Sequence, residues 1–368
     1  MIILSIETSC DETAISIIKV TENKNKQPVF KILADEIASQ IDIHKEYGGV
    51  YPMLAKREHI KNLPILFKKT LEKANLSNGQ EDIDLIAVTQ GPGLEPALWT
   101  GINFATELAK KMPTGRQKKI PIIPVNHMEG HIFSASVNRS REEFIISDFQ
   151  FPAMALLISG GHTELVLIKD WLKYKIIGQT RDDAVGEAFD KVARLLGFPY
   201  PGGPEISKLT ELGGGTSSGG STSLKLPRPM INSGDYDFSF AGLKTAVLYK
   251  IREIKNLTDE IKIGFAREFQ NAVIDILINK TIKASEEYNV KTILLGGGVS
   301  ANKQIQNAFK SLCKKNNIKL LLPQKNMITD NSLMIAIAGY IRYKHKKSQI
   351  INSKLQLEII ADGNLKLS

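Results

Sequence analysis

Two histidines four residues apart, His127 and His131, are the side chains in this sequence best suited to bind a metal ion. They follow an apolar run at residues 120–125, which predicts a short buried strand, and Asn126 is placed to cap a helix that carries both. Because residues four apart share one helix face, both imidazoles would point the same way. The pattern is equally compatible with a pair of ordinary surface histidines.

A carboxylate far along the chain could complete such a site. Asp330 precedes a helix expected at residues 332–343, where either Thr329 or Asp330 could be the N-cap. Capping is the more common role at this place. A His, His, Asp set, however, would leave coordination positions open for a substrate, as catalytic metals require. The sequence pattern leaves both roles open.

A zinc protease could carry a similar motif, but helix geometry argues against peptide hydrolysis. In metallopeptidases the catalytic glutamate directly follows the first histidine. Here Glu129 follows His127 by two positions, about 200° around the helix. We therefore expect Glu129 to point away from a metal held by the two histidines.

Length and composition indicate a two-domain protein without membrane segments. The chain has 368 residues, of which 42% are hydrophobic and 24% charged. No stretch approaches the ~20 apolar residues of a membrane span, and no signal composition precedes the first strand. Two cysteines, Cys10 and Cys313, cannot make a disulfide framework, so we expect a cytoplasmic protein. The net charge of +9 permits nucleic-acid binding but does not by itself indicate it.

Two hairpins of similar design are predicted about one domain length apart. The first spans residues 2–20 with a polar turn at 8–11, and the second spans 153–168 with the turn Ser159-Gly160-Gly161-His162. Backbone amides in such turns can bind anions, and glycine lets the chain approach a ligand closely. The repetition predicts two duplicated lobes with phosphate loops facing a central cleft.

Strands alternate with helices along the rest of the chain, which predicts an α/β fold. The expected strands are 37–39, 83–89, 175–180, 292–295 and 320–322, and the expected helices are 51–74, 94–110, 184–196, 261–287 and 332–343. We expect a first domain at 1–147, a second at 148–346 and a C-terminal tail at 347–368. Residues 213–223, rich in Gly and Ser, are expected to form a surface loop.

Two further stretches could contact a nucleotide. Residues 294–302 resemble a strand, a glycine turn and a helix start, at which Asn302 could hydrogen-bond a ligand. An ordinary strand-to-helix turn explains the same pattern equally well. The acidic stretch 182–190, which ends at Asp190, could hold ribose hydroxyls, although such acids more often form a solvated helix face.

Taken together, the sequence resembles the bacterial form of the tRNA adenosine threonylcarbamoyltransferase family, also called TsaD and formerly described as O-sialoglycoprotein endopeptidase. The motifs that carry this resemblance are Ile6-Glu7-Thr8-Ser9-Cys10-Asp11-Glu12-Thr13, His44 with Tyr47-Gly48-Gly49-Val50, Gly91-Pro92-Gly93-Leu94, His127-Met128-Glu129-Gly130-His131, Ser159-Gly160-Gly161-His162-Thr163, Gly186-Glu187-Ala188-Phe189-Asp190-Lys191, Phe238-Ser239-Phe240 with Gly242-Leu243-Lys244, Gly296-Gly297-Gly298-Val299-Ser300-Ala301-Asn302 and Thr329-Asp330-Asn331. Because so many motifs occur in order over nearly the whole chain, the set is specific.

The resemblance implies the two-lobe fold of actin, sugar kinases and heat-shock chaperone ATPases. It also implies transfer of a threonylcarbamoyl group from threonylcarbamoyl-AMP to the exocyclic amine of the adenosine 3′ of the anticodon (position 37), in tRNAs that read codons starting with A, with release of AMP. By this resemblance His127, His131 and Asp330 would bind iron or zinc. The residues implied to hold the adenylate, or ATP, ADP or AMP, are Leu157, Ile158, Ser159, Gly160, Gly161, Asp190, Gly203 and Asn302. No general base is assigned.

The implied partners are tRNA, a paralogous subunit and a small ATPase, with no membrane. An actin-like ATPase or sugar kinase is the alternative function, although paired histidines have no role there; a non-catalytic scaffold is another. The sequence departs from the family at Tyr51-Pro52-Met53, where Val-Pro-Glu is common, and at Ile328, where Cys is frequent. Ser207 stands where some members have an Asp that contacts the ligand.

Overall fold

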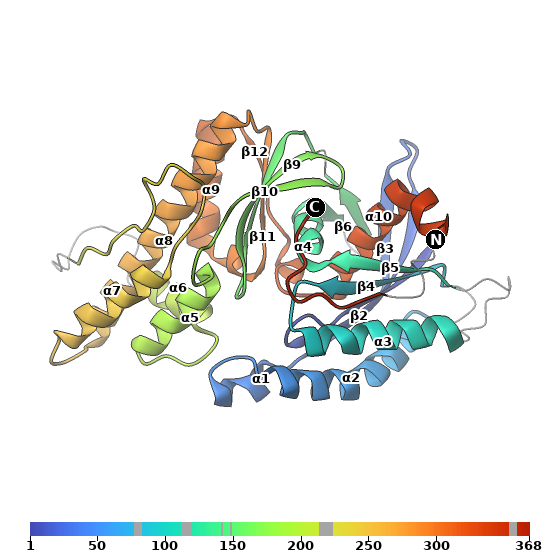
Figure 1. Cartoon of the computed structure of the whole chain (residues 1–368), viewed down its shortest axis with the longest axis horizontal. Coiled ribbons are helices and arrows are strands. Elements are labelled where there is room, and N and C mark those ends of the chain that lie inside the picture. Colours follow the sequence, from blue (N-terminus) through green and yellow to red (C-terminus); the bar gives the residue numbers. More distant parts are fainter. Residues whose placement is uncertain (77–82, 112–119, 141–142, 148, 213–223, 353–358) are drawn as a thin grey trace. The chain divides into compact units, whose positions relative to one another are not determined.

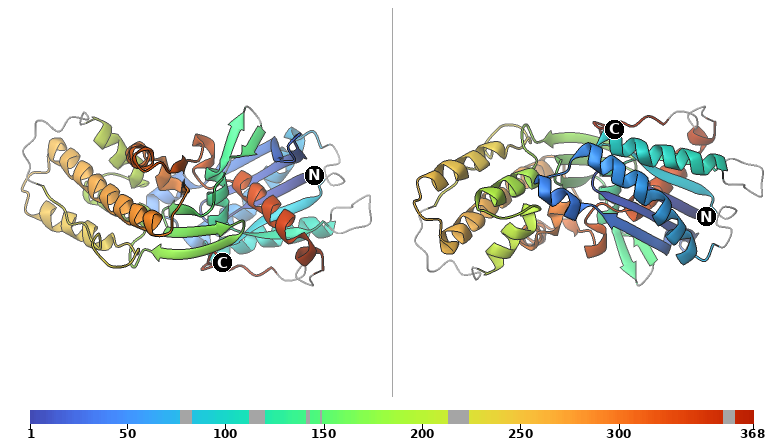
Figure 2. Two further views of the ribbon diagram at one scale, coloured as in Figure 1. Left: turned by 90° about the horizontal axis from the view of Figure 1, so that it is seen from above. Right: turned by 90° about the horizontal axis from the view of Figure 1, so that it is seen from below.

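The computed structural model describes residues 1–76, 83–111, 120–140, 143–147, 149–212, 224–352 and 359–368. The predicted surface loop at 213–223 lies outside these residues. The chain separates into two compact units, one of Met1–Phe149 with Pro323–Ser368 and one of Gln150–Leu322. Figures 1 and 2 show the course of the chain.

The first unit contains one mixed sheet. Its strands are β1 (Ile2–Glu7), β2 (Glu12–Glu22), β3 (Pro28–Ser39), β4 (Leu85–Gly91), β5 (Ile122–Asn126), β6 (Val137–Ser140) and β7 (Glu143–Ile146). Within the described residues they lie in the order β5-β4-β1-β2-β3-β7-β6. β1 is antiparallel to β2 and parallel to β4, and β4 is parallel to β5. The carboxyl ends of β1, β4 and β5 therefore meet at one edge of the sheet.

Helices cover both faces of this sheet. They are α1 (Ile41–His44), α2 (Pro52–Lys73), α3 (Glu95–Lys111), α4 (His127–Ala135) and α10 (Ser332–Asn352), with short 3-10 turns η1 (Lys45–Tyr47) and η3 (Lys325–Met327). Leu4 and Ile17 of the sheet pack with Leu98 of α3 in one core cluster. Successive strand residues face opposite sides, so Ser16, whose hydroxyl meets that of Ser332 in α10, lies on the other face.

The closing helix changes the predicted domain boundary. Residues 323–346 were expected in the second domain, yet α10 packs against β1, β2, β4, β5 and α4 of the first. Helix α10 belongs to the first unit because its beginning is apolar: the six consecutive residues 333–338 are all buried against the first sheet. The first unit is therefore built from the two ends of the chain.

The second unit repeats the same strand plan. Its strands are β8 (Ala153–Ile158), β9 (Thr163–Asp170), β10 (Lys173–Gln179), β11 (Thr292–Gly296) and β12 (Lys319–Leu321). Their order, β10-β9-β8-β11-β12, matches β3-β2-β1-β4-β5 in sequence and in strand direction. Both predicted hairpins, and the α/β fold with duplicated lobes, are thus confirmed.

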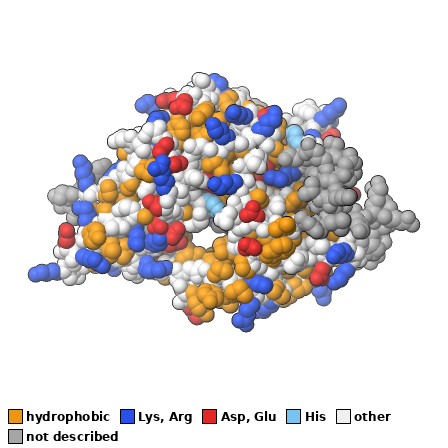
Figure 3. Space-filling view, in the orientation of Figure 1, with side chains coloured by type: hydrophobic (Ala, Val, Ile, Leu, Met, Phe, Trp, Pro, Cys, Tyr) orange, Lys and Arg blue, Asp and Glu red, His pale blue; other side chains and the backbone are white. Residues whose placement is uncertain are grey.

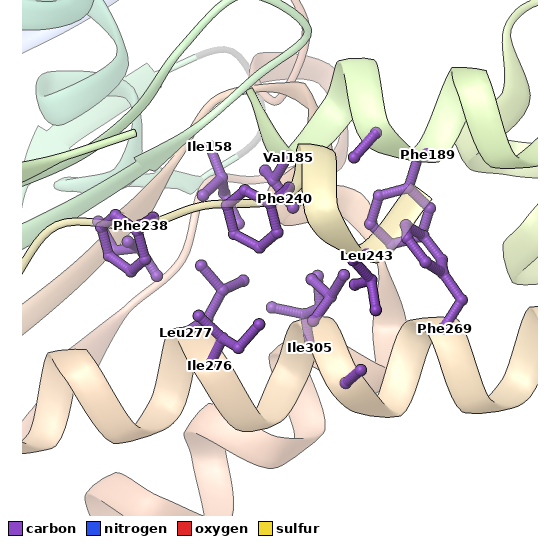
Figure 4. Close-up of a cluster of buried hydrophobic side chains, with 14 of the residues drawn as sticks. Ile158, Val185, Phe189, Phe238, Phe240, Leu243, Phe269, Ile276, Leu277 and Ile305 are labelled. Atoms are coloured by element: carbon purple, nitrogen blue, oxygen red, sulfur yellow. The ribbon is translucent and has the colours of Figure 1, made fainter. Parts of the chain in front are cut away.

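The helices of the second unit enclose an aromatic-rich core. They are α5 (Val185–Leu195), α6 (Gly202–Leu212), α7 (Ala241–Arg252), α8 (Asp259–Glu287) and α9 (Lys303–Lys315), with the 3-10 turn η2 (Gly298–Ala301). Figure 4 shows Phe189 of α5 beside Phe269 of α8, with ring centroids 5.0 Å apart. Among the described residues, no helix combines the length and apolar character needed to cross a membrane.

Candidate metal centre and nucleotide loops

The two histidines of the predicted metal site lie on α4, which begins where β5 ends. Asn126 caps this helix as expected, because its side-chain oxygen accepts hydrogen bonds from the amides of Met128 (2.9 Å) and Glu129 (3.3 Å). His127 and His131 are 6% and 0% exposed, which excludes a pair of surface side chains. Their ring centroids lie 4.7 Å apart.

Asp330 meets both rings from the turn before α10. Its Oδ1 lies 3.3 Å from Nε2 of His127 and 3.2 Å from Nε2 of His131. The helix is capped by neither predicted residue: Asn331 accepts the amide of Met334 at 2.9 Å. Asn331 performs the capping, so the Asp330 carboxylate is directed at the histidines.

The donor set fits a divalent metal. Nitrogen and oxygen atoms of His127, His131 and Asp330 lie within 4.8 Å of one another. Both ring nitrogens of His131 are buried, and neither makes a hydrogen bond of good geometry in the described part of the chain, although Nε2 lies 3.2 Å from the Asp330 carboxylate. Leaving a buried polar atom unsatisfied costs about 1–3 kcal/mol, so this ring is held ready for a ligand outside the protein. Two imidazoles and one carboxylate suit iron or zinc.

A second carboxylate stands behind His127. Oε2 of Glu7, at the end of β1, lies 3.1 Å from Nδ1 of His127, and Thr89 donates to the same oxygen at 2.5 Å. Oε1 of Glu7 accepts the amide of Ser9, whose hydroxyl lies 3.2 Å from Nδ1 of His127. These contacts fix the ring so that Nε2 faces Asp330. Glu7 was not predicted as a site residue from the sequence. The signal that could have identified it is an acidic residue at the end of an otherwise apolar strand.

The positive charge of His127 and the negative charges of Glu7 and Asp330 stabilise each other. Burial opposes ionisation of Glu7, but the attraction of His127 outweighs it and lowers the Glu7 pKa. Burial likewise opposes ionisation of Asp330, and His127 and His131 hold its pKa far below the usual range. Burial disfavours protonation of His127, yet Asp330 and Glu7 raise its pKa well above the usual value. The carboxylates therefore favour a cation beside them.

Glu129 has a different partner. Its fully buried carboxylate forms an ion pair with the guanidinium of Arg342 on α10. This contact ties α4 to α10 and directs the acid towards Arg342. A metallopeptidase would need it at the metal, so the geometry argues against proteolysis.

The predicted phosphate turn of the second unit is open. Leu157 and Ile158 are buried in β8, and the turn closes through the Ser159 amide, which donates to the His162 carbonyl at 2.9 Å. A Cβ at Gly160 or Gly161 would meet nothing within 4 Å. The backbone here is accessible to a ligand on its outer side.

Asp190 and Asn302 organise the neighbouring helices. Oδ1 of Asp190 accepts the amide of Gly202 at 2.7 Å, and burial raises the Asp190 pKa. Nδ2 of Asn302 donates to Ser207 (3.0 Å) and to Gln270 (2.6 Å), while its Oδ1 caps α9. Asp190 and Asn302 thus hold α6 and α9, and a Cβ at Gly203 would meet nothing within 4 Å.

The structure groups the predicted site residues in two sets. The metal residues His127, His131 and Asp330 belong to the first unit. The predicted adenylate residues, from Leu157 to Asn302, belong to the second. Sequence order alone did not separate them, because Asp330 follows the second unit in the chain.

A family model described as tRNA N6-adenosine threonylcarbamoyltransferase matches residues 31–337. The chain belongs to this family. A relative from Thermosipho africanus with that description is 46% identical over 345 residues, which is 94% of this chain and 95% of the relative. One from Bacillus cereus, with the same description, is 43% identical over 348 residues, 94% of this chain and 92% of the relative. As a member of the threonylcarbamoyltransferase family, the protein is a transferase.

Solved structures support the fold of this family member. HypF from T. kodakarensis aligns with a TM-score of 0.56 at 12% identity, over 94% of this chain and 48% of that one. At this identity the likeness shows the fold alone. It agrees with the predicted α/β, actin-like ATPase architecture.

Proposed function

We propose that the protein transfers the threonylcarbamoyl group of threonylcarbamoyl-AMP to the exocyclic amine of the adenosine 3′ of the anticodon (position 37), in tRNAs that read codons starting with A. The amine nitrogen bonds to the carbamoyl carbon, the bond to AMP breaks, and one proton leaves the amine. Membership of the transferase family supports the reaction class. The observation that supports metal assistance is that His127, His131 and Asp330 lie close enough together to bind one metal ion.

Residues of the first unit would hold iron or zinc. When bound to His127, His131 and Asp330, the metal would supply a Lewis acid for the donor's carbonyl oxygen. Glu7 orients the His127 ring, and the pair of Glu129 with Arg342 fixes α4 against α10. These contacts arrange the ligands before the substrate arrives, which lowers the reorganisation needed during reaction.

Residues of the second unit would hold the donor adenylate. Amides around Gly160, Gly161 and Gly203 can approach its phosphate without steric hindrance. We propose that Asp190 and Asn302 shape this site from the positions described above, with Leu157 to Ser159 as its floor. ATP, ADP or AMP would bind the same loops.

We propose tRNA, a paralogous subunit and a small ATPase as partners, with the reaction in the cytoplasm. The net charge of +9 favours contact with tRNA phosphates. A protein partner is supported by an exposed apolar surface over α1 and α2, visible as orange side chains in Figure 3. Its residues are Ile43, Tyr47, Tyr51, Met53, Ile60 and Ile65.

A transfer assay tests the proposal. The protein, with and without the partner proteins, is mixed with threonylcarbamoyl-AMP and unmodified tRNA, and digested nucleosides are identified by mass. Modified adenosine that disappears with a chelator and returns with iron or zinc is the expected result. Absence of product under every condition would leave the fold and overturn the proposed reaction, in favour of an ATPase or a scaffold.

A further inference from the structure

The last ten residues of the chain lie along the carboxyl end of β4. The amide of Asp362 donates to the carbonyl of Gln90 at 3.0 Å, and the amide of Gly93 donates to the carbonyl of Gly363 at 3.2 Å. Nε2 of Gln90 donates to the carbonyl of Ile360 at 3.0 Å. We call residues 359–368 the C-terminal strap.

The strap is closely packed against the first unit. Two of its side chains, Ala361 and Leu367, are only 6% and 7% exposed. A Cβ added at Gly91 would lie 1.8 Å from the carbonyl oxygen of Asp362, and one at Gly363 would lie 2.9 Å from that of Gly93. Only glycine permits this approach of two backbones, so the strap occupies a fixed place on β4.

One link joins the strap to the metal helix through Asn126. Nδ2 of Asn126 donates to the carbonyl of Leu365 at 3.3 Å, while Oδ1 of the same amide caps α4. Because one planar amide makes both contacts, the strap sets the orientation of the cap. His127 is the first residue of α4, directly after this cap.

A second link runs through Ser9. The amide of Leu94 donates to the carbonyl of Ser9 at 2.8 Å, and a Cβ at Gly93 would lie 2.6 Å from that oxygen. The strap therefore holds the turn after β4 against Ser9. The hydroxyl of Ser9 lies 3.2 Å from Nδ1 of His127, so both links end at the same ring.

We propose that the C-terminal strap is a positioning element of the metal centre, which keeps the His127 ring aligned by acting on Asn126 and Ser9. The inference rests on the proposed metal centre and extends it to residues with no ligand atoms. Loss of a group that hydrogen-bonds a metal ligand directly typically lowers metal affinity by about 10- to 100-fold, and the strap acts one contact further out, through Asn126 and Ser9. The strap is thus expected to act on metal affinity more than on overall folding.

Two variants of the full protein release the strap. Leu367→Asp places a charge at a buried position, and a stop codon after residue 358 removes the segment entirely. Ser368→Asp is the matched control, because it adds the same charge at the exposed neighbouring residue. The probe is Co²⁺, titrated by its visible absorption and competed with Zn²⁺, with circular dichroism to verify folding.

The proposal expects Leu367→Asp and the shortened chain to raise the Co²⁺ dissociation constant at least about tenfold and to alter the spectrum of the bound ion. Ser368→Asp should match the parent. Parent-like Co²⁺ binding by the folded shortened chain would overturn the strap's role and leave the metal centre standing. Co²⁺ binding that is absent from the parent, or unchanged by His131→Ala, would overturn the centre and this inference together. Affinity lost only together with the folded state, in both variants, would assign the strap to general stability.

Discussion

Nδ1 of His127 lies 3.1 Å from Oε2 of Glu7, although the two residues are 120 positions apart in the chain. Glu7 ends β1 and His127 follows β5, and β4 lies between these two strands in the sheet. Glu7 is fully buried, and each of its carboxylate oxygens accepts a hydrogen bond from the protein. The pair fixes which nitrogen of His127 faces Asp330. Glu7 is therefore as much a part of the centre as the three candidate ligands.

Glu7→Gln should weaken metal binding about 10- to 100-fold without unfolding the protein, because an amide keeps the size but loses the charge and one acceptor. Isothermal titration with Zn²⁺ measures the change. Glu22→Gln, at the exposed end of β2, is the matched control. Equal affinity in both variants would remove Glu7 from the metal centre.

His131→Ala should abolish metal binding and transfer together, because the buried His131 ring faces Asp330 without a hydrogen bond of good geometry among the described residues. Bound metal is measured by elemental analysis and transfer by nucleoside mass. His345→Ala, at an exposed position of α10, should retain both. Full transfer by a metal-free His131→Ala protein would contradict the assigned role.

Gly160→Val should raise the dissociation constant for AMP at least tenfold, since a side chain would fill the space kept open at the turn. The structure has room for a Cβ at Gly160, so folding should be retained. Gly234→Val is the control, as Gly234 is equally open but lies outside the proposed site. The idea fails if AMP binds both variants as it binds the parent.

The ion pair of Glu129 with Arg342 predicts a stability effect. Removing one partner of a buried pair costs about 3–5 kcal/mol, so Arg342→Met should lower Tm markedly. The double variant with Glu129→Gln should regain part of the loss, because it no longer buries an acid deprived of its cation. Thermal unfolding of Arg342→Met, Glu129→Gln and the double variant measures this effect. If the decreases in Tm of the two single variants add up to that of the double variant, the two residues are not coupled.

His59 predicts a pH dependence of stability. Its Nε2 lies 2.9 Å from the Cys10 carbonyl and its Nδ1 2.7 Å from the Thr13 hydroxyl. Burial lowers the His59 pKa below its usual value of 6.5, so the unfolded chain binds the proton first as pH falls. The contribution is complete above pH 6.5 and is lost as pH falls towards the lowered pKa. Tm of the parent should fall more than that of His59→Gln between pH 7.5 and 5.5, approximately spanning the ordinary histidine range. Parallel curves would exclude His59 as the group responsible.

Local patterns predicted the parts of the site that lie close together in the chain. The spacing of His127 and His131 and the cap Asn126 follow from helix periodicity, and both hairpins follow from alternation. The sequence predicted Asp330 either as the N-cap of the helix at 332–343 or as a metal ligand, but it did not predict the cap one residue later, Asn331. Thr329, Asp330 and Asn331 can all cap a helix, and only the tertiary structure decides which of them does so.

Contacts between distant segments could not be predicted this way. The links from Glu7 to His127 and from Leu365 to Asn126 join residues more than 100 positions apart. Helices α6 and α7 were also missed. Helix α7 begins without a side-chain cap, and α6 begins at Gly202, whose amide is bound by Asp190, 12 positions earlier in the chain. The contact of Ser207 with Asn302, 95 positions later in the chain, also helps to place α6.

The return of the chain's end to the first unit sets an order of events during synthesis. Strand β5 and helix α4 leave the ribosome early, whereas Asp330, α10 and the strap emerge only after all of the second unit. Until Asp330 is made, the nascent first unit presents two histidines without their carboxylate partner. The candidate metal centre therefore depends on a late segment of the chain: a chain that stops before residue 330 lacks one of the three candidate ligands.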